Sequence, residues 1–463
     1  MVIARMADAV SAGVGGLAHA VTDVFDPTLR LGVTGLSRAG KTVFVTSLVA
    51  NLLDRGRMPA LSAGPRIEAA YLEPQPDDTV PRFDYEANLA TLTGPRPDWP
   101  EGTRAVSELR LSIRARQGGL LAGLRGARVL HVDIVDYPGE WLLDLALMEL
   151  DYAQWSDRAL ARLATWDAGA YEAALATAEP SARLAEPEAK RLAAAYTEAL
   201  REARAAGACD LTPGRMLLPG EMEGSPALTF APLPPGEAPR GSLAREFARR
   251  YEAYKSRIVR PFFRDHFARI DRQVVLVDVM GALRRGPRAV AELREALTDI
   301  LRAFNPGRAG WLRALLGGRR IDRILFAATK ADHLHHAQHA RLQAILESMV
   351  DEARRRADFA GAETRAMALA SLRTTTEVRR AVDGTEMDLV AGTLMDGRAV
   401  ALSPGALPED PGLLAADADG RRWLDGDYDA MDFRPAPSTL RRGEGPPHVR
   451  LDRAAEFLLG DRL

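Results

Sequence analysis

A glycine-rich segment near the start of the chain has the residue types and spacing that bind nucleotide phosphates. Residues 35–42 match the pattern G-x-x-x-x-G-K-[ST], in the order Gly35, Leu36, Ser37, Arg38, Ala39, Gly40, Lys41 and Thr42. In such a loop, backbone N–H groups surround the phosphates, the lysine reaches the β- and γ-phosphates, and the hydroxyl binds Mg²⁺. We therefore expect residues 35–43, ending at Val43, to bind phosphate, with Lys41 also catalytic and Thr42 a metal ligand.

A second group of chemically suited residues follows an apolar run at 129–135. Asp136 and Gly139 belong to the segment Asp-Tyr-Pro-Gly, in which a carboxylate can hold Mg²⁺ and the glycine N–H can sense a γ-phosphate. These residue types are also common in ordinary turns, but their position downstream of the phosphate pattern favours the nucleotide interpretation. Glu140 comes next. Its carboxylate could act as a base, or its charge beside a γ-phosphate could make hydrolysis slow.

A third motif has residues that could recognise the base of a nucleotide. Lys330 and Asp332 lie in Thr-Lys-Ala-Asp, directly after an apolar run at 324–328. The Asp332 carboxylate can accept hydrogen bonds from the two donors on the guanine edge, a pair that adenine lacks, and the Lys330 stem can lie along the base. An aspartate there could instead cap a helix. His333 is expected in the same pocket, and backbone N–H groups at Ser371 and Leu372 could bond the guanine O6.

The long segment 55–103 is rich in Pro, Gly and Asp, and segments of this length are usually functional or mobile. We expect Thr103 to supply a second hydroxyl to Mg²⁺, and Trp99, in the same short motif, to contact the nucleotide. Other hydroxyls stay open for that metal role, namely Thr91, Thr93 and Ser107. Arg38 and Arg104 could neutralise charge in the transition state, although each could equally be a solvated side chain.

Two further features are weaker candidates for function. His335 and His339 have a zinc-compatible i, i+4 spacing, but no companion cysteine or carboxylate pattern appears, so a solvated helix face is the better interpretation. Residues 1–28 have the period of an amphipathic helix. This helix carries few cations, whereas interfacial helices usually have a basic face. We therefore favour packing on the protein or on a partner over peripheral membrane association.

Elements of two kinds must position these residues. Apolar, β-branched runs predict strands, and the intervening Ala-, Glu-, Leu- and Arg-rich stretches predict helices. Strands that alternate with helices indicate an α/β fold with a mainly parallel sheet and flanking helices. The predicted strands are 31–34, 105–114 and 127–135 as a hairpin, 274–280, 324–328 and 366–370. The predicted helices include residues 41 to about 53, much of 141–206, and 241–271.

Composition excludes several classes of protein. The formal net charge of −2 argues against a broad nucleic-acid surface. Cys209 is the single cysteine, so no disulfide can form within the chain, which suits a reducing, cytoplasmic compartment. No apolar run of about 18 residues predicts a membrane span, and the N-terminus lacks the pattern of a secretory signal.

The order of these motifs resembles the G1, G3, G4 and G5 motifs of P-loop GTPases. More narrowly, residues 35–42, Trp-Pro-x-x-Thr at 99–103, Asp-Tyr-Pro-Gly-Glu-Trp at 136–141, Thr-Lys-Ala-Asp-His at 329–333 and the segment 451–461 look like the YcjX family of bacterial stress-associated GTPases. The resemblance runs nearly end to end. It implies a G domain with insertions, binding of GTP and GDP with Mg²⁺, and a role in a stress response.

Combined with the predicted elements, this resemblance divides the chain into units. We expect an N-terminal helix over 1–28, a G domain in two parts over 29–140 and 272–375, a helical insertion over 141–271, and a C-terminal extension over 376–463 with a hairpin at 387–402 and a closing helix at 451–459. Three functions remain open. They are a GTP hydrolase that switches conformation, a nucleotide-gated binding or scaffold protein with negligible turnover, and a P-loop kinase for a small substrate. The sequence does not identify a protein partner.

Overall fold

The computed structural model describes residues 27–36, 38–103, 105–116, 127–166, 168–209, 211–302, 321–359, 361–382, 385–403, 405–412, 432–437 and 440–463. The predicted N-terminal helix, apart from its last two residues, lies outside this part of the chain, as do Ser37 and Arg104. None of the described helices is long and apolar enough to cross a membrane.

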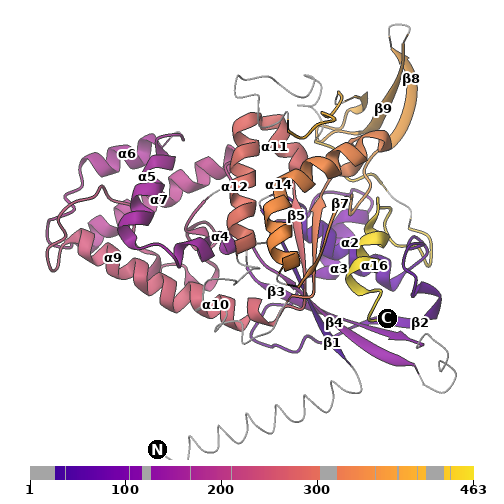
Figure 1. Ribbon diagram of the computed structural model, residues 1–463, viewed down its shortest axis with the longest axis horizontal. Coiled ribbons are helices and arrows are strands. Elements are labelled where there is room, and N and C mark those ends of the chain that lie inside the picture. The colour runs from indigo at the N-terminus through magenta and orange to yellow at the C-terminus, as the bar shows by residue number, and fades with distance from the viewer. Residues whose placement is uncertain are drawn as a thin grey trace, which may run out of the picture.

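A seven-stranded, mostly parallel sheet forms the centre of the molecule, so the fold is mixed α/β, as predicted (Figure 1). Its strand order is β2-β3-β4-β1-β5-β6-β7. The five strands from β4 to β7 are mutually parallel, and β3 pairs antiparallel with β4 and with β2. The hairpin of β3 and β4 is therefore confirmed. The strands are β1 (Thr28–Gly35), β2 (Ile67–Glu73), β3 (Ser107–Ala115), β4 (Arg128–Asp136), β5 (Arg272–Val277), β6 (Arg323–Ala328) and β7 (Glu363–Ala368).

Both faces of the sheet are covered by helices, because the parallel strands are apolar on both sides. On β5, Val274 and Leu276 join one core cluster and Val275 and Val277 join the other. One face packs on α2 (Lys41–Leu53), with α3 (Tyr85–Thr93) beside it, and on α16 (Leu451–Leu459). The other face packs on α4 (Glu140–Leu147), α11 (Val279–Arg285), α12 (Pro287–Arg302) and α14 (His339–Phe359).

The predicted strand 274–280 was too long at its C-terminal end. The strand stops at Val277, and Val279 and Met280 already belong to α11. Asp278 ends the strand because its carboxylate accepts a 2.9 Å hydrogen bond from the Gly281 N–H and so caps the new helix. Val279 and Met280 are apolar because α11 buries them, and for that reason their apolarity resembled a continued strand.

Between β4 and β5, the chain after α4 forms a group of helices that we call the helical lobe (α5 to α10), which lies to the left of the sheet in Figure 1. Its members are α5 (Tyr152–Leu163), α6 (Gly169–Ala176), α7 (Glu186–Ala205), α8 (Gly214–Leu217), α9 (Leu243–Tyr254) and α10 (Arg260–Asp265). An aromatic core holds the lobe together. Trp155 stacks on Tyr251, with ring centroids 5.1 Å apart, and Tyr196 and Phe230 meet its edges.

The helical stretch predicted over 241–271 runs without a break from Leu243 to Asp265, but it is not one regular α-helix. After α9 the backbone widens into a π-helical turn, Lys255–Val259, and Pro261 lies in the first turn of α10. Proline is tolerated at that position because it needs no N–H partner there. Shorter 3₁₀ turns elsewhere span Gly64–Arg66, Gly220–Met222, Pro226–Leu228, Phe267–Arg269, Ala331–His333 and His336–Gln338.

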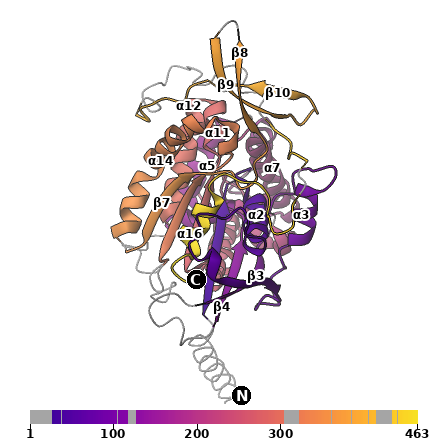
Figure 2. The ribbon, with the colours of Figure 1, turned by 90° about the vertical axis from the view of Figure 1, so that its right-hand side faces the viewer.

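A separate three-stranded sheet follows β7 and projects from the body (Figures 1 and 2). Its antiparallel pair β9 (Thr385–Thr393) and β10 (Ala399–Leu402) is the predicted hairpin. The turn there includes Gly397 at φ 91°, a backbone conformation that glycine adopts readily. The third strand, β8 (Thr376–Val382), pairs with β9 and was not predicted.

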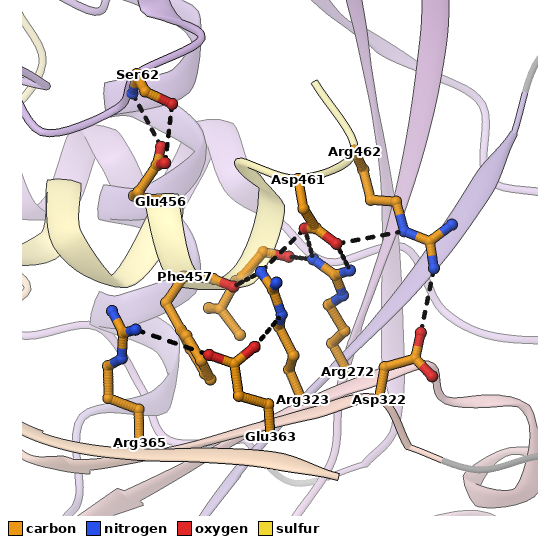
Figure 3. Close-up of polar contacts among 11 residues, drawn as sticks. Ser62, Arg272, Asp322, Arg323, Glu363, Arg365, Glu456, Phe457, Asp461 and Arg462 are labelled. Atoms are coloured by element: carbon orange, nitrogen blue, oxygen red, sulfur yellow. Dashed lines mark hydrogen bonds and ion pairs between the residues drawn. The ribbon is translucent and has the colours of Figure 1, made fainter. Parts of the chain in front are cut away.

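The C-terminal helix α16, at its predicted position, is tied to the sheet by an ionic network (Figure 3). Arg272, only 1% exposed, donates two 2.6 Å hydrogen bonds to the Asp461 carboxylate and a third to the Leu458 carbonyl. Arg323 also reaches Asp461, at 3.0 Å, and its guanidinium lies over the Phe457 ring. These contacts hold the end of the chain against the N-terminal ends of β5 and β6.

Candidate nucleotide site

A cavity of about 560 Å³ lies at the carboxyl edge of the parallel strands, where α/β sheets usually bind ligands. Loops after three of these strands, β1, β6 and β7, reach it, together with the segment before β3 and parts of the C-terminal region. Many of the residues predicted from the sequence line it. They are Arg38, Ala39, Gly40, Lys41, Thr42, Val43, Trp99, Thr103, Lys330, Asp332, His333, Ser371 and Leu372.

One end of the cavity is formed by the loop between β1 and α2. Gly40 has φ 83°, a left-handed conformation that favours glycine, and it directly precedes the first residue of α2. The first N–H groups of a helix have no partners within the helix, and its dipole is positive there. Lys41 is largely buried, and its ammonium donates a 2.8 Å hydrogen bond to the Gly35 carbonyl. This end is therefore electropositive and rich in N–H donors.

Three oxygen-bearing side chains lie beside this loop. The Thr103 hydroxyl donates a 2.6 Å hydrogen bond to Oδ2 of Asp136, and the Thr42 hydroxyl donates to the Glu101 carbonyl at 3.3 Å. Among the residues described, Oδ1 of Asp136 is buried without a hydrogen-bond partner. Burial raises the pKa of Asp136 to about 6, against the opposing effects of Lys41 and Thr103. Hydroxyl and carboxylate oxygens are the donors that Mg²⁺ takes, so this set fits a magnesium ion.

The alternative hydroxyls lie elsewhere. Thr91 and Thr93 sit in α3 and donate to the Ala87 and Leu89 carbonyls one turn earlier, and Ser107 begins β3. Neither these three residues nor Asp136 line the cavity itself. Of the four hydroxyls, only that of Thr103 is bonded to Asp136 in the described structure. The geometry therefore favours Thr103 for the metal role.

Gly139 and Glu140 follow β4 and lie outside the lining of the main cavity. A Cβ atom added to Gly139 would come within 2.5 Å of the Gly35 carbonyl oxygen, so the backbone approaches the phosphate loop as closely as glycine permits. Glu140 begins α4, is 2% exposed, and does not line the main cavity. Its carboxylate forms an ion pair with Arg204 of α7, at 2.9 Å. The interpretation of Glu140 as a group in direct contact with a γ-phosphate therefore has no geometric support.

The opposite end of the cavity contains the residues predicted to select a base. Oδ2 of Asp332 accepts hydrogen bonds from the Thr374 N–H and hydroxyl, each 2.7 Å long, which hold the carboxylate in one orientation. Lys330 has φ 60°, and its ammonium donates to Oδ2 of Asp278 at 2.6 Å. Burial opposes ionisation of Asp278, but Lys330, the Gly281 N–H and Arg285 together outweigh it and lower the pKa of this carboxyl. Lys330 thus lines the cavity while Asp278 holds its ammonium.

Several lining residues had no signal in the sequence. Thr374 and Arg204 belong to no recognisable motif, and Phe433 comes from the C-terminal region. Asp278, which accepts the hydrogen bond from Lys330 without lining the cavity, belongs to no motif either. The indole N–H of Trp99 donates to the Phe433 carbonyl at 2.9 Å, across 334 residues of chain. The Phe433 ring also meets the His333 ring at 5.0 Å between centroids. Only folding brings these segments together, so local spacing could not reveal them.

The histidine cluster differs from its prediction. His339 is 4% exposed, and its Nε2 is 2.8 Å from the Ala331 carbonyl oxygen, so it is a core histidine rather than part of a solvated face. Burial lowers its pKa. Carboxylate companions do exist, because β8 brings Glu377 within 2.7 Å of His336 and 3.8 Å of His335. The histidines with a carboxylate neighbour are therefore His335 and His336, and not the i, i+4 pair of His335 and His339.

Together, the fold and the site define a class of protein. The chain is an α/β protein with a seven-stranded, mostly parallel sheet and a ligand-sized cavity at its carboxyl edge. Comparison with known proteins then identifies the family. The sequence model for the YcjX-like family, DUF463, matches residues 29–463, and the chain belongs to this family, as its motifs predicted.

Two relatives are similar over almost their whole length. One, from Escherichia coli (strain K12), is named Ras-like GTPase YcjX and is 38% identical over 459 residues, which cover 95% of this chain and 96% of the relative. The other, from Shewanella oneidensis, has the same name and is 36% identical over 468 residues, which cover 95% of each chain.

Proposed function

We propose that this protein is a magnesium-dependent guanine-nucleotide-binding protein that hydrolyses GTP to GDP. One observation carries the proposal. A single cavity is lined at one end by Lys41 and Thr42 and at the other by Lys330 and Asp332. The phosphates would lie against the first pair and the base against the second. The names of the two relatives support the same activity.

Each residue then has a defined task. The N–H groups of residues 38–43 and the Lys41 ammonium bind phosphate oxygens, and Asp332, held by Thr374, accepts the two donors of guanine. Thr42, Thr103 and Asp136 would hold Mg²⁺, Asp136 directly or through water. The ion would neutralise charge on the β- and γ-phosphate oxygens.

We also propose that the nucleotide state is passed to the helical lobe. Gly139 touches the phosphate loop and directly precedes α4. Asp144 of α4 accepts hydrogen bonds from the Gly214 N–H and the Tyr254 hydroxyl of the lobe, and the Trp141 indole donates to the Leu218 carbonyl. A shift of Gly139 toward a γ-phosphate would therefore move the lobe. The lobe surface is where we place contacts with a protein partner.

This proposal assigns roles to the expected units of the chain. Residues 29–140 and 272–375 act as the G domain, 141–271 as the insertion that responds to it, and 376–463 as an extension that closes the base end. A cytoplasmic role in a bacterial stress response follows from the family resemblance of the motifs. The N-terminal segment carries few cations, so peripheral membrane association is the less favoured alternative.

Single-turnover hydrolysis tests the proposed function. Protein in excess over radiolabelled GTP should release phosphate with Mg²⁺ present and not with EDTA, and Lys41→Ala should abolish the release. GTP binding without phosphate release over hours would support the alternative, a nucleotide-gated binding protein. A phosphorylated small product would instead indicate a kinase.

Hydrogen exchange tests the switch separately. Residues 90–103 and 140–160 should exchange more slowly with a non-hydrolysable GTP analogue than with GDP, because Thr103 and Gly139 gain partners. Equal protection in the two states would leave the lobe as a fixed support for the sheet.

A further inference from the structure

The helical lobe contributes an arginine to the nucleotide cavity. Arg204 lies at the penultimate position of α7 (Glu186–Ala205), and its side chain, 29% exposed, lines the cavity together with Arg38, Lys41 and Thr103. Every other described residue of the lobe is absent from that lining. Arg204 is thus the point at which the lobe reaches the place where phosphates would bind.

A buried carboxylate holds this arginine in place. The Glu140 side chain is 3% exposed, and its Oε1 lies 2.9 Å from a terminal nitrogen of Arg204. In the part of the chain that the structure describes, both Glu140 oxygens are buried and accept no hydrogen bond, so the guanidinium is the group that balances their charge. A buried carboxylate without such a partner would be strongly unfavourable.

The pair lies at the phosphate end of the cavity. Glu140 follows Gly139, which packs on the Gly35 carbonyl, and that carbonyl also accepts the hydrogen bond from Lys41. The lobe is seated firmly at the same point, because a Cβ atom on Gly214 would come within 2.1 Å of the Glu140 carbonyl oxygen. The lobe backbone therefore packs on the same residue, Glu140, whose carboxylate pairs with Arg204.

Two other arginines nearby lack this arrangement. Arg201, one turn earlier on α7, is exposed and pairs with Glu198 at 2.9 Å on the helix surface. Arg38 lines the cavity but is exposed. Of these three arginines, Arg204 alone combines contact with the cavity and a buried anchoring carboxylate.

We infer that Arg204 is a catalytic residue that stabilises the transition state of GTP hydrolysis, and that Glu140 is its positioning residue. This inference rests on the proposed function. A guanidinium has five N–H donors, so Arg204 can keep its contact with Glu140 and still donate to a γ-phosphate oxygen. The helical lobe would then supply within one chain the charge that some GTPases take from a partner protein.

The reaction itself balances without a further reactant. The oxygen of a water molecule bonds to the γ-phosphorus while the bond from that phosphorus to the β–γ bridging oxygen breaks, and the bond electrons leave with GDP. One water proton goes to solvent and the other stays on the phosphate product. Arg204 remains protonated throughout and compensates the charge that gathers on the bridging and γ-phosphate oxygens.

Single-turnover hydrolysis and equilibrium binding of Arg204→Ala, compared with wild type, test this inference. We expect hydrolysis to slow at least 100-fold, toward the range of about 10³–10⁵ found for such arginines. GTP affinity should stay within about threefold, because the contact forms mainly in the transition state, and retained affinity also shows that the variant is folded. The tighter binding of GDP in the presence of aluminium fluoride, a transition-state mimic, should be lost. The hydrolysis rate of Arg204→Lys should lie between the rates of wild type and Arg204→Ala, since lysine keeps the positive charge but lacks the planar guanidinium.

Arg201→Ala is the matched control, and it should hydrolyse GTP like wild type. If wild type hydrolyses GTP and Arg204→Ala does so at the same rate, the inference about Arg204 is wrong while the proposed function stands. If wild type binds GTP and never hydrolyses it, the hydrolase function fails, and the role of Arg204 in catalysis fails with it.

Discussion

The Thr103 hydroxyl lies 2.6 Å from Oδ2 of Asp136, and this hydrogen bond joins the segment between α3 and β3 to the C-terminal end of strand β4. Thr103 and Asp136 are 33 residues apart in sequence. Thr103 lines the cavity together with Thr42, whereas Asp136 lies outside the lining. The bond ties a cavity-lining residue of the segment before β3 to the end of β4.

Thr103→Ala should therefore weaken magnesium-dependent binding of GTP. We expect the affinity for a GTP analogue to fall about tenfold with Mg²⁺ and to be unchanged in EDTA, because one oxygen ligand is lost. Fluorescence titrations at several Mg²⁺ concentrations measure this. Thr91→Ala is the control, since its hydroxyl bonds only within α3. Equal magnesium dependence in Thr103→Ala and wild type would remove Thr103 from the metal site.

Glu140 and Arg204 should act as one unit in hydrolysis. Glu140→Gln should slow hydrolysis less than Arg204→Ala does, and the double variant should be no slower than Arg204→Ala alone, because Glu140 acts through the arginine. A double-mutant cycle of single-turnover rates measures the coupling. Additive losses would show that Glu140 contributes independently, as a general base would.

Asp144 should make the stability of the fold depend on pH. Burial raises its pKa from an ordinary 3.8 to about 7, although Tyr254 and the Gly214 amide oppose the shift. The folded chain therefore keeps a proton that the unfolded chain releases near pH 4. The resulting stabilisation is complete below that pH and is lost as the pH rises through about 7.

Asp144→Asn removes this dependence while leaving one acceptor for Gly214 and one donor for Tyr254. Between pH 5 and 8, the free energy of unfolding of wild type should fall by about 2–3 kcal/mol relative to the variant. Urea unfolding at each pH measures the difference. A constant difference across this range would mean that Asp144 titrates in the folded chain as it does in the unfolded chain.

Asp461→Ala should destabilise the fold. Asp461 lies at the N-terminal ends of β5 and β6, and the cavity lies at the carboxyl edge of the sheet. The substitution leaves the buried Arg272 guanidinium without its carboxylate, which should cost about 3 kcal/mol in the free energy of unfolding. Asp322→Ala is the control. It removes the exposed pair with Arg462, and such pairs contribute at most about 1 kcal/mol. Urea unfolding compares the two, and equal losses would contradict a structural role for the network in Figure 3.

The sequence predicted the parts of this molecule that are encoded locally. The motifs around Lys41 and Asp332 could be found because each one directly follows an apolar strand, and α2 and α16 begin and end as predicted. The end of β5 could not be predicted, because Val279 and Met280 are as apolar in α11 as they would be in a strand. What decides that boundary is the cap formed by Asp278.

Contacts between distant segments could not be predicted at all. Phe433 reaches Trp99, and β8 carries Glu377 to His336, through tertiary packing that leaves no periodic trace in the sequence. Arg204 belongs to the same group, because many exposed arginines on the lobe helices have similar neighbours in sequence. Whether such a residue reaches the site depends on where its segment lies in three dimensions, and the whole fold sets that position.

Competition titration of the wild-type protein with GDP and ADP tests whether the cavity selects guanine through Asp332. We predict that GDP binds at least about 100-fold more tightly than ADP, because adenine lacks the donor pair that Asp332 accepts. Asp332→Asn should weaken GDP binding and favour xanthosine diphosphate, whose C2 carbonyl can accept from the new amide. Equal affinity of the wild-type protein for ADP and GDP would contradict guanine selection through Asp332.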